Sequence, residues 1–276
     1  MSSTFIIAVQ EVRAGLRNRW VLATTLLLAA LALSLTLLGS APVGGVKADP
    51  LSIVVVSLAS LSIFLLPLIA LLLSFDSVVG EAERGTLLLL LAYPLARWQV
   101  VLGKFIGHVA ILALATVIGY GAAAAALVVK SGNAAELDWA AFSGLLGSSV
   151  LLGAAFLALG MLISTVVRER ATAAGVAVGI WFVLVLIYDA ALLGVLVAGQ
   201  NRILSADSLD LLLLANPADA FRLLNLTVTD GAKALSGMAG LGEAGRLPMW
   251  ALLGSLAAWS VVPLAAAVAI FNRREP

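Results

Sequence analysis

The amino-acid sequence predicts an all-α fold: a polytopic membrane protein with six transmembrane helices, an N-terminal interfacial helix and a long outer loop between spans five and six. The chain of 276 residues is 62% hydrophobic and only 11% charged, and its mean hydropathy is +1.13. A soluble domain carries about 45–50% apolar and about 25% charged residues. The polar residues are too few to cover a globule, which excludes a soluble enzyme.

Composition also excludes several kinds of site. The net charge of +1 lacks the excess of basic residues that nucleic-acid binding requires. With no cysteine, one histidine and four methionines, the chain cannot assemble a metal centre from soft ligands. No phosphate-binding loop of the G-x-x-x-x-G-K-[ST] type is present, because the one Gly-Lys pair, Gly103-Lys104, is followed by Phe105. We therefore expect no catalytic residue, metal or cofactor on this chain.

Apolar stretches of about 20 residues, the length that spans a bilayer as a helix, recur along the chain. We therefore interpret residues 1–276 as a single transmembrane domain. The predicted spans are residues 20–39, 51–75, 105–129, 142–167, 171–198 and 250–271. They are continuous Leu, Ala and Val runs without the alternation of a barrel strand. Only Arg168, Glu169 and Arg170 separate the fourth span from the fifth, which predicts a tight helical hairpin there.

The basic residues predict the orientation. If both termini share one side, that side receives ten Lys or Arg residues and the other side six, so the positive-inside rule places both termini in the cytoplasm. The alternative is that the first span is a cleaved signal peptide, which would leave five spans. Its apolar run of about 20 residues exceeds the 7–15 residues of a signal core, and we therefore interpret it as a span.

Residues 4–19 precede the first span. Apolar side chains recur there at helical spacing on one face: Phe5, Val9, Val12, Leu16 and Trp20. Polar residues and arginines occupy the other faces, as in a helix that lies in the membrane interface. A simple extension of the first span into the headgroup region explains the pattern equally well, and the two interpretations are compatible.

The segment 76–104 connects spans two and three. Its charges gather at the start, and Gly85-Thr86 then opens a run of five leucines. We predict that Thr86 caps a short helix, that Pro94 ends it, and that Arg97 and Lys104 lie where span three enters the membrane. Five leucines are too few to span, and their exposure to water is unfavourable. Lipid or a partner protein should cover them, or else the segment packs on its own bundle as a re-entrant loop.

The outer loop of residues 199–249 is long, and loops of this length are usually functional or disordered. Its apolar pieces, residues 209–214 and 216–224, argue against simple disorder. They predict short helices that dip back toward the membrane, or a platform for an extracytoplasmic partner.

Two ionisable residues fall within spans. Asp189 is the one carboxylate inside a span, and His108 lies near the cytoplasmic end of span three. Intramembrane ionisable groups suggest function, which leaves open a proton-coupled secondary carrier that uses both residues. The structural alternatives are a hydrogen bond from Asp189 to a serine of a neighbouring helix and an interfacial hydrogen bond for His108. No basic partner for Asp189 is apparent within the spans.

The segment after span two has a pattern of the form G-E-x-E-x-G-T-L, followed by a proline, an arginine and a Gly-Lys pair. Together with the order of the spans, this pattern resembles the ABC-2 type permease family. The matching residues are Gly80, Glu81, Glu83, Gly85, Thr86, Leu87, Pro94, Arg97, Gly103 and Lys104. The resemblance implies a membrane subunit that is not itself an enzyme, works as a dimer, and pairs with a separate ATPase subunit that binds ATP and Mg.

Two longer runs, GEAERGTLLLLLAYPLARWQVVLGKFIGH and NPADAFRLLNL, resemble those family members that serve the assembly of a periplasmic copper–sulfide centre. That resemblance implies a homodimer in the bacterial inner membrane, two ATPase subunits and a periplasmic β-helical protein. The implied cargo is a sulfur species or copper. Since the chain offers no ligands for copper, a sulfur-containing molecule or mechanical gating of the partner fits it better.

The resemblance also implies sites. The expected contact with the ATPase comprises Glu81, Glu83, Arg84, Gly85, Thr86, Leu87, Leu88, Pro94 and Arg97. The expected contact with the periplasmic partner comprises Asn216, Pro217, Asp219, Phe221 and Arg222. The alternative to transport is a membrane anchor for an assembly complex that moves nothing across the bilayer.

Overall fold

The computed structural model describes residues 3–38, 50–92, 95–132, 139–198, 206–228 and 247–273. Within these ranges every regular element is a helix, which confirms the all-α prediction. Six helical stretches are long and apolar enough to cross a membrane, and each overlaps one predicted span. They are Arg19–Leu37, Val54–Glu83, Arg97–Lys130, Trp139–Val166, Arg170–Ala198 and Met249–Arg273.

The spans pack around α7 (Trp139–Val166), which contacts α3 (Pro50–Ser74), α6 (Arg97–Ser131) and α13 (Met249–Arg273). In an apolar stretch of 18 residues taken from each helix, 78% of the residues of α7 are buried, against 6% in the span Arg170–Ala198. The span α2 (Arg19–Leu38) packs on α6 at the edge of the bundle. The fifth span therefore has few fully buried residues and leaves much of its apolar surface for lipid or another protein to cover, whereas α7 forms the core.

Helix α6 begins earlier than predicted, at Arg97 instead of Phe105. The backbone N–H of Ala96 donates to Gln99 Oε1, which satisfies a donor at the start of the helix. The apolar residues that follow continue the helix without interruption, so Arg97 and Lys104 both belong to it. Its end at Gly132 has a left-handed conformation with φ of 71°, and the Gly132 N–H donates to Val128 O.

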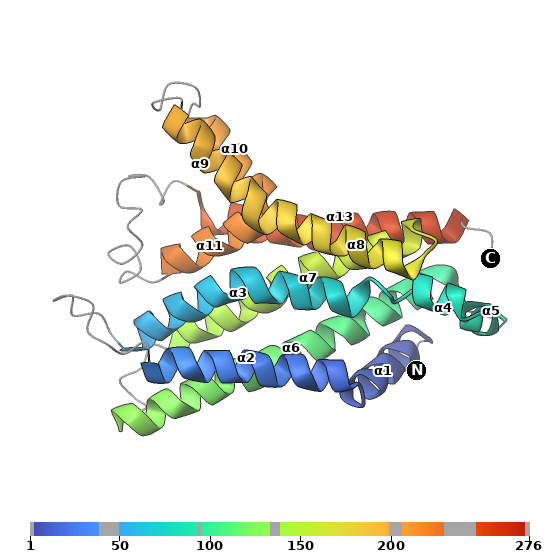
Figure 1. The fold of residues 1–276 in the computed structure, drawn as a ribbon, viewed down its shortest axis with the longest axis horizontal. Helices are drawn as coiled ribbons and strands as arrows, with labels where there is room; N and C mark the ends of the chain where they lie inside the picture. The colour runs from blue at the N-terminus through green and yellow to red at the C-terminus, as the bar shows by residue number, and fades with distance from the viewer. Residues whose placement is uncertain are drawn as a thin grey trace.

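Residues 3–16 form α1 (Ser3–Leu16), which packs along α6. Asn18 Oδ1 accepts from the N–H of Trp20 and marks the start of α2. Figure 1 shows α1 set at an angle to α2 near the N-terminus. Helix α1 is therefore present where the spacing of apolar residues predicted a helix. That it lies in the membrane interface stays a prediction.

The fifth span contains an irregularity that the sequence did not predict. It runs as α8 (Arg170–Phe182), a π-helical segment (Val183–Ile187) and α9 (Tyr188–Ala198). Three residues separate α8 from the end of α7, as expected of a tight hairpin. In Figure 1, α9 turns away from the axis of α8 and projects from the bundle, and α10 projects with it.

In the described part of the predicted outer loop two helices form, α10 (Ala206–Ala215) and α11 (Pro217–Val228). Helix α11 packs against α3, α7 and α13, so this part of the loop does turn back onto the bundle. The remaining parts of the predicted loop, residues 199–205 and 229–246, lie outside the described residues.

Candidate coupling site

Both chain termini, the α7–α8 turn and the segment between spans two and three gather at one end of the bundle, seen at the right of Figure 1. We refer to it as the termini-bearing end. The segment contains two short helices, α4 (Val79–Glu83) and α5 (Thr86–Leu91). The predicted short helix is thus present as α5, and α4 and α5 together contain five of the nine residues of the expected ATPase contact. Pro94 lies outside the described residues.

Two glycines of the family pattern have clear structural reasons. A Cβ atom at Gly80 would lie 1.9 Å from Asp76 Oδ1, so a larger residue would force that carboxylate to move. Gly85 has φ of 70°, a conformation that non-glycine residues rarely adopt, and it separates α4 from α5. Thr86 was predicted to cap α5. Instead it is the first residue of the helix, and its hydroxyl donates to the carbonyl of Glu81.

The centre of the site is a charge cluster around Lys104. Its Nζ lies 2.6 Å from Glu11 Oε1 and 2.7 Å from Glu81 Oε1. The Lys104 side chain is only 4% exposed, so the two carboxylates supply the interactions that water would otherwise provide. Because Glu11 belongs to α1, Glu81 to α4 and Lys104 to α6, this cluster ties three helices together.

The close approach of α1 to α6 depends on glycine. A Cβ at Gly103 would lie 2.7 Å from Ile7 Cβ and 2.9 Å from Thr4 O, and one at Gly107 would lie 2.5 Å from Glu11 Cβ. These glycines bring Glu11 within reach of Lys104. The Gly103-Lys104 pair of the family pattern therefore provides both the space and the charge for docking α1.

A second set of polar contacts joins α4 to the α7–α8 turn. Glu83 Oε1 accepts from the backbone N–H of Arg170 at 2.6 Å, and Arg170 Nε lies 2.9 Å from Asp76 Oδ1. Arg84 is the more distant partner, 3.7 Å from Asp76. The hydroxyl of Ser164 on α7 accepts from the N–H groups of Val78 and Val79. The α3–α4 turn is thus held by α7 and α8.

Arg97 connects the start of α6 to the last turn of α13. Its guanidinium donates to the carbonyls of Phe271 and Asn272, each at 3.3 Å. A cation at the C-terminus of a helix interacts favourably with its dipole and its free carbonyls. Glu81, Glu83, Arg84 and Arg97, expected to pair with an ATPase, thus make their described contacts within the chain.

Apolar side chains of α5 show a different arrangement. Leu87 is buried, while Leu88 is 58% and Leu89 is 70% exposed. Between the end of α4 and the start of α8, a recess of about 500 Å³ is lined by Glu83, Glu169 and Arg170 together with Phe75, Ala171 and Ala174. The termini-bearing end therefore offers both an exposed leucine pair on α5 and a recess lined by charged residues of α4 and the α7–α8 turn.

His108 was expected to form an interfacial hydrogen bond, and the structure places it differently. Its side chain is 8% exposed, and Glu11 Oε2 lies 3.9 Å from its Nε2. Its Nδ1 has no hydrogen bond to any residue that the structure describes. His108 is therefore a buried neighbour of the Lys104 cluster.

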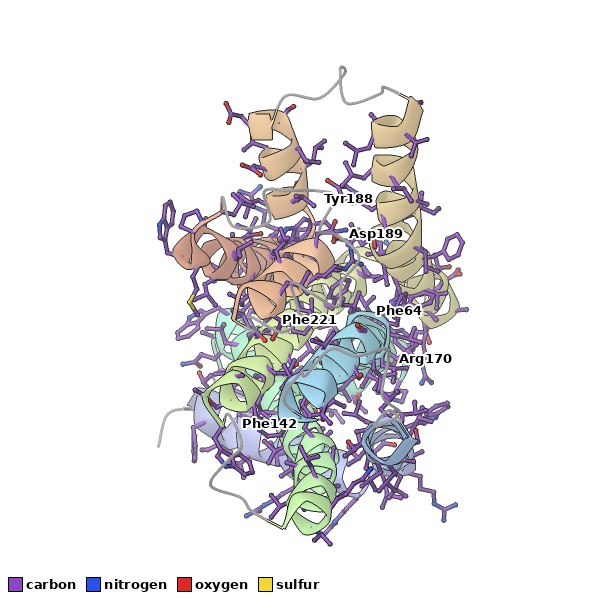
Figure 2. The ribbon with its side chains drawn as sticks, turned by 90° about the vertical axis from the view of Figure 1, so that its left-hand side faces the viewer. Phe64, Phe142, Arg170, Tyr188, Asp189 and Phe221 are labelled. Atoms are coloured by element: carbon purple, nitrogen blue, oxygen red, sulfur yellow. The ribbon has the colours of Figure 1, made fainter. Side chains whose placement is uncertain are left out.

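The residues expected to contact a periplasmic partner lie at the opposite end of the bundle. Asn216, Asp219 and Phe221 are almost fully buried, and Pro217 is buried as well. In this conformation they face the protein interior, because α11 packs on the bundle. Figure 2 shows Phe221 within the bundle, below Tyr188 and Asp189.

Asp189 has a basic partner that lies outside the spans. Arg222 Nη2 donates to Asp189 Oδ2 at 2.5 Å, and Nη1 donates to Asp219 Oδ1 at 2.8 Å. This partner belongs to α11 in the predicted outer loop, which agrees with the expectation that the spans themselves hold no basic partner. The proposed bond from Asp189 to a neighbouring serine is replaced by this ion pair.

Sequence reasoning also missed Glu11 and Ser164. Glu11 lies 93 residues before Lys104, and one serine in an apolar span has no distinguishing pattern. The signal that could have found Glu11 is its place on the polar face of α1, combined with the adjacent glycines at Gly103 and Gly107.

These features define a class: a helical membrane protein with six candidate spans and a short helical segment between spans two and three at its termini-bearing end. The model of the ABC-2 family transporter protein matches residues 5–275, and the chain belongs to this family. It is similar to the probable ABC transporter permease protein NosY of Stutzerimonas stutzeri, with 46% identity over 276 residues. It is 48% identical over 276 residues to the protein of the same name from Pseudomonas aeruginosa. Each comparison covers 99% of both chains.

Proposed function

We propose that this chain is the permease subunit of the ABC transporter for nitrous oxide reductase maturation, as the name of its relatives suggests. It acts as a homodimer in the bacterial inner membrane, with both termini in the cytoplasm. Two separate ATPase subunits bind ATP and Mg and hydrolyse the nucleotide. The full-length similarity to NosY proteins supports this proposal.

The observation that carries the mechanism is the exposed pair Leu88 and Leu89 on α5. A short helix with an exposed apolar face docks in a hydrophobic groove, and the covering that we expect for these leucines is a groove on the ATPase. The recess with Glu83, Glu169 and Arg170 at the same end of the bundle provides charged groups, which would favour one orientation of the partner.

Movement of α5 would pass into the bundle through the contacts of its flanks. Glu81 joins α4 to α1 and α6 through Lys104. Glu83 joins α4 to α8 at Arg170, and Arg97 joins α6 to α13. A displacement of this segment by the ATPase therefore reaches four other helices without requiring any of these charges to contact the ATPase.

The cargo that we propose is a sulfur species for the copper–sulfide centre of the reductase. Copper is the less favoured cargo, because the described residues include no cluster of three or more His, Cys, Asp or Glu side chains. Mechanical action on a periplasmic β-helical partner is equally compatible with the fold. Since Asn216 and Phe221 are buried, such a contact would fall instead on α10, whose Leu211 is 69% exposed.

A tagged chain purified in mild detergent, followed by mass spectrometry, tests the proposal. We expect an ATPase subunit at equal stoichiometry, with a periplasmic protein present in part of the sample. The double change Leu88→Ser and Leu89→Ser should remove the ATPase, whereas Leu211→Ser, an equally exposed position at the other end, should not.

A chain that purifies alone and moves substrate in liposomes without ATP would overturn the proposal in favour of a proton-coupled carrier. An ATPase that stays bound to a complex with no substrate movement would indicate the membrane anchor. If Glu81→Ala with Glu83→Ala leaves both assembly and ATPase stimulation intact, transmission through α4 is wrong.

A further inference from the structure

The π-helical segment of span five (Val183–Ile187) and the start of α9 are held by α10, α11 and the residue that links them. Residues of a π-helix bond at a spacing of five instead of four, and such segments occur mostly at functional sites. Asn216 Nδ2 donates to the carbonyl of Leu184 inside this segment at 2.8 Å. The link from α10 to α11 therefore contacts the irregular backbone directly.

Two further contacts fix the first turn of α9. The hydroxyl of Tyr188 donates to the carbonyl of Leu212 on α10 at 2.7 Å, and Arg222 on α11 donates to Asp189. Helix α10 is itself tied to α13, because Ser255 Oγ donates to Leu214 O at 2.6 Å. Helices α10 and α11 thus hold the point where α8 gives way to α9. Figure 2 shows Tyr188 and Asp189 at this place.

The charges of Asp189, Asp219 and Arg222 in these contacts do not balance. One cation, Arg222, lies between two carboxylates, and Asp219 is only 2% exposed. Asp219 Oδ2 accepts no hydrogen bond from the residues that the structure describes. Burial raises the pKa of the Asp219 carboxyl to about 7; Asp189 adds to the rise, and Arg222 opposes it.

The other elements packed against α11 contribute no compensating charge. Helices α3 and α7 contain no charged residue, and the one charge of α13 is Arg273 at its far end. Helix α10 carries Asp207 and Asp210. Among the described residues, the groups that interact with Asp219 are therefore Arg222, Asp189, Asn216 and the phenol of Tyr188.

We propose that Asp189, Asp219 and Arg222 form a proton-operated latch, which locks α11 against the π-helical segment of span five when Asp219 is protonated and loosens when it is ionised. Protonation leaves Arg222 to neutralise Asp189 alone, so the buried cluster has no net charge. Ionisation adds a second carboxylate that is poorly solvated and repelled by Asp189.

The sign follows from linkage. In the latched state the carboxyl holds its proton up to a pH of about 7, whereas a solvated aspartate loses it near pH 3.9. Protons therefore stabilise the latched state in the window between these values, and the stabilisation is lost as the pH rises through 7. Between pH 8 and pH 6 the ratio of latched to released molecules should rise about tenfold.

The chain contains no cysteine, so a single introduced thiol reports opening. Ala220 is fully buried on α11, and Ala215 is exposed at the end of α10. We would label Ala220→Cys in the full chain in lipid nanodiscs with a membrane-impermeant thiol reagent. Dividing its rate by that of Ala215→Cys at the same pH removes the intrinsic pH dependence of the thiol.

We expect the relative labelling of Ala220→Cys to fall about tenfold from pH 8 to pH 6. Adding Asp219→Asn should keep it low at both pH values, and Asp189→Asn should move the transition to lower pH. Asp207→Asn, the matched control on α10, should leave the transition unchanged. The latch would be overturned if labelling of Ala220→Cys were independent of pH in the chain that retains Asp219. It would also be overturned if the pH transition persisted after Asp219→Asn.

Discussion

The two ends of the bundle carry charge clusters of the same composition, one cation between two carboxylates, but they bury opposite members. At the termini-bearing end the Lys104 side chain is 4% exposed, and its partners Glu11 and Glu81 are 21% and 23% exposed. At the other end Arg222 is 28% exposed, and its partner Asp219 is 2% exposed. The buried member is a cation in one cluster and an acid in the other.

This difference separates a permanent tie from a switch. Lysine ordinarily titrates far above neutral pH, so a lysine held by two carboxylates is a fixed connection under physiological conditions. A carboxyl group in an apolar site can instead accept a proton near neutrality. The comparison suggests that α1, α4 and α6 move as one body, whereas α11 and span five can separate.

The largest effect should come from breaking the tie. Lys104→Met leaves Glu11 and Glu81 facing one another without their shared cation, and the loss of one partner from a buried pair costs about 3–5 kcal/mol. We expect a large fall in the midpoint of thermal unfolding of the purified chain, together with loss of the ATPase. Arg17→Ala, an exposed position after α1, is the control. A stable Lys104→Met protein would show that the cluster does not hold α1.

A smaller effect should follow from separating α1 and α6 without touching a charge. Gly103→Ala places a Cβ 2.7 Å from Ile7 Cβ, and overpacking of this kind costs about 1–3 kcal/mol. The same change at Gly121 on the same helix has no atom within 4 Å and should be neutral or stabilising. Thermal unfolding of the two variants in parallel measures the difference. Equal midpoints would show that α1 docks more loosely than the structure indicates.

The spans and the short helix α5 were predictable from the sequence because each depends on local composition. Runs of about 20 apolar residues require helices in a bilayer, and a glycine before a leucine run suffices to indicate a break. The residues at which the helices begin and end were not predictable in this way. The start of α6 at Arg97 depends on a bond from Ala96 to the side chain of Gln99, and no apolar pattern reveals it.

The charge clusters were beyond prediction because each joins residues distant in sequence. Asp189 and Arg222 are 33 residues apart, and their pairing requires that α11 fold back onto the bundle. The sequence indicated that residues 216–224 form a helix, but it did not indicate which face would be buried. For that reason Asn216, Asp219 and Phe221 were expected at a partner surface and instead lie in the interior.

The pH dependence of stability sharpens the comparison further. Because the pKa of Asp219 is raised to about 7, folding is more favourable below neutral pH, and the difference between pH 6 and pH 8 should be about 1.4 kcal/mol. Asp219→Asn should abolish this part of the dependence. Thermal unfolding at several pH values measures it, with Asp207→Asn as control. A higher midpoint at pH 8 than at pH 6 would contradict the assignment.

Exchanging the cation at the switch should have the smallest effect. Arg222 uses two nitrogens of its guanidinium, one for Asp189 and one for Asp219, and a lysine cannot reproduce this fork. Arg222→Lys keeps the charge and removes the simultaneous bonds, so we expect a loss of about 0.5–1.5 kcal/mol, the usual worth of one hydrogen bond. The shift of the unfolding midpoint should retain its pH dependence, because the buried acid is still present. If Arg222→Lys is as damaging as Lys104→Met, both clusters are structural ties, and the distinction between the two ends of the bundle is lost.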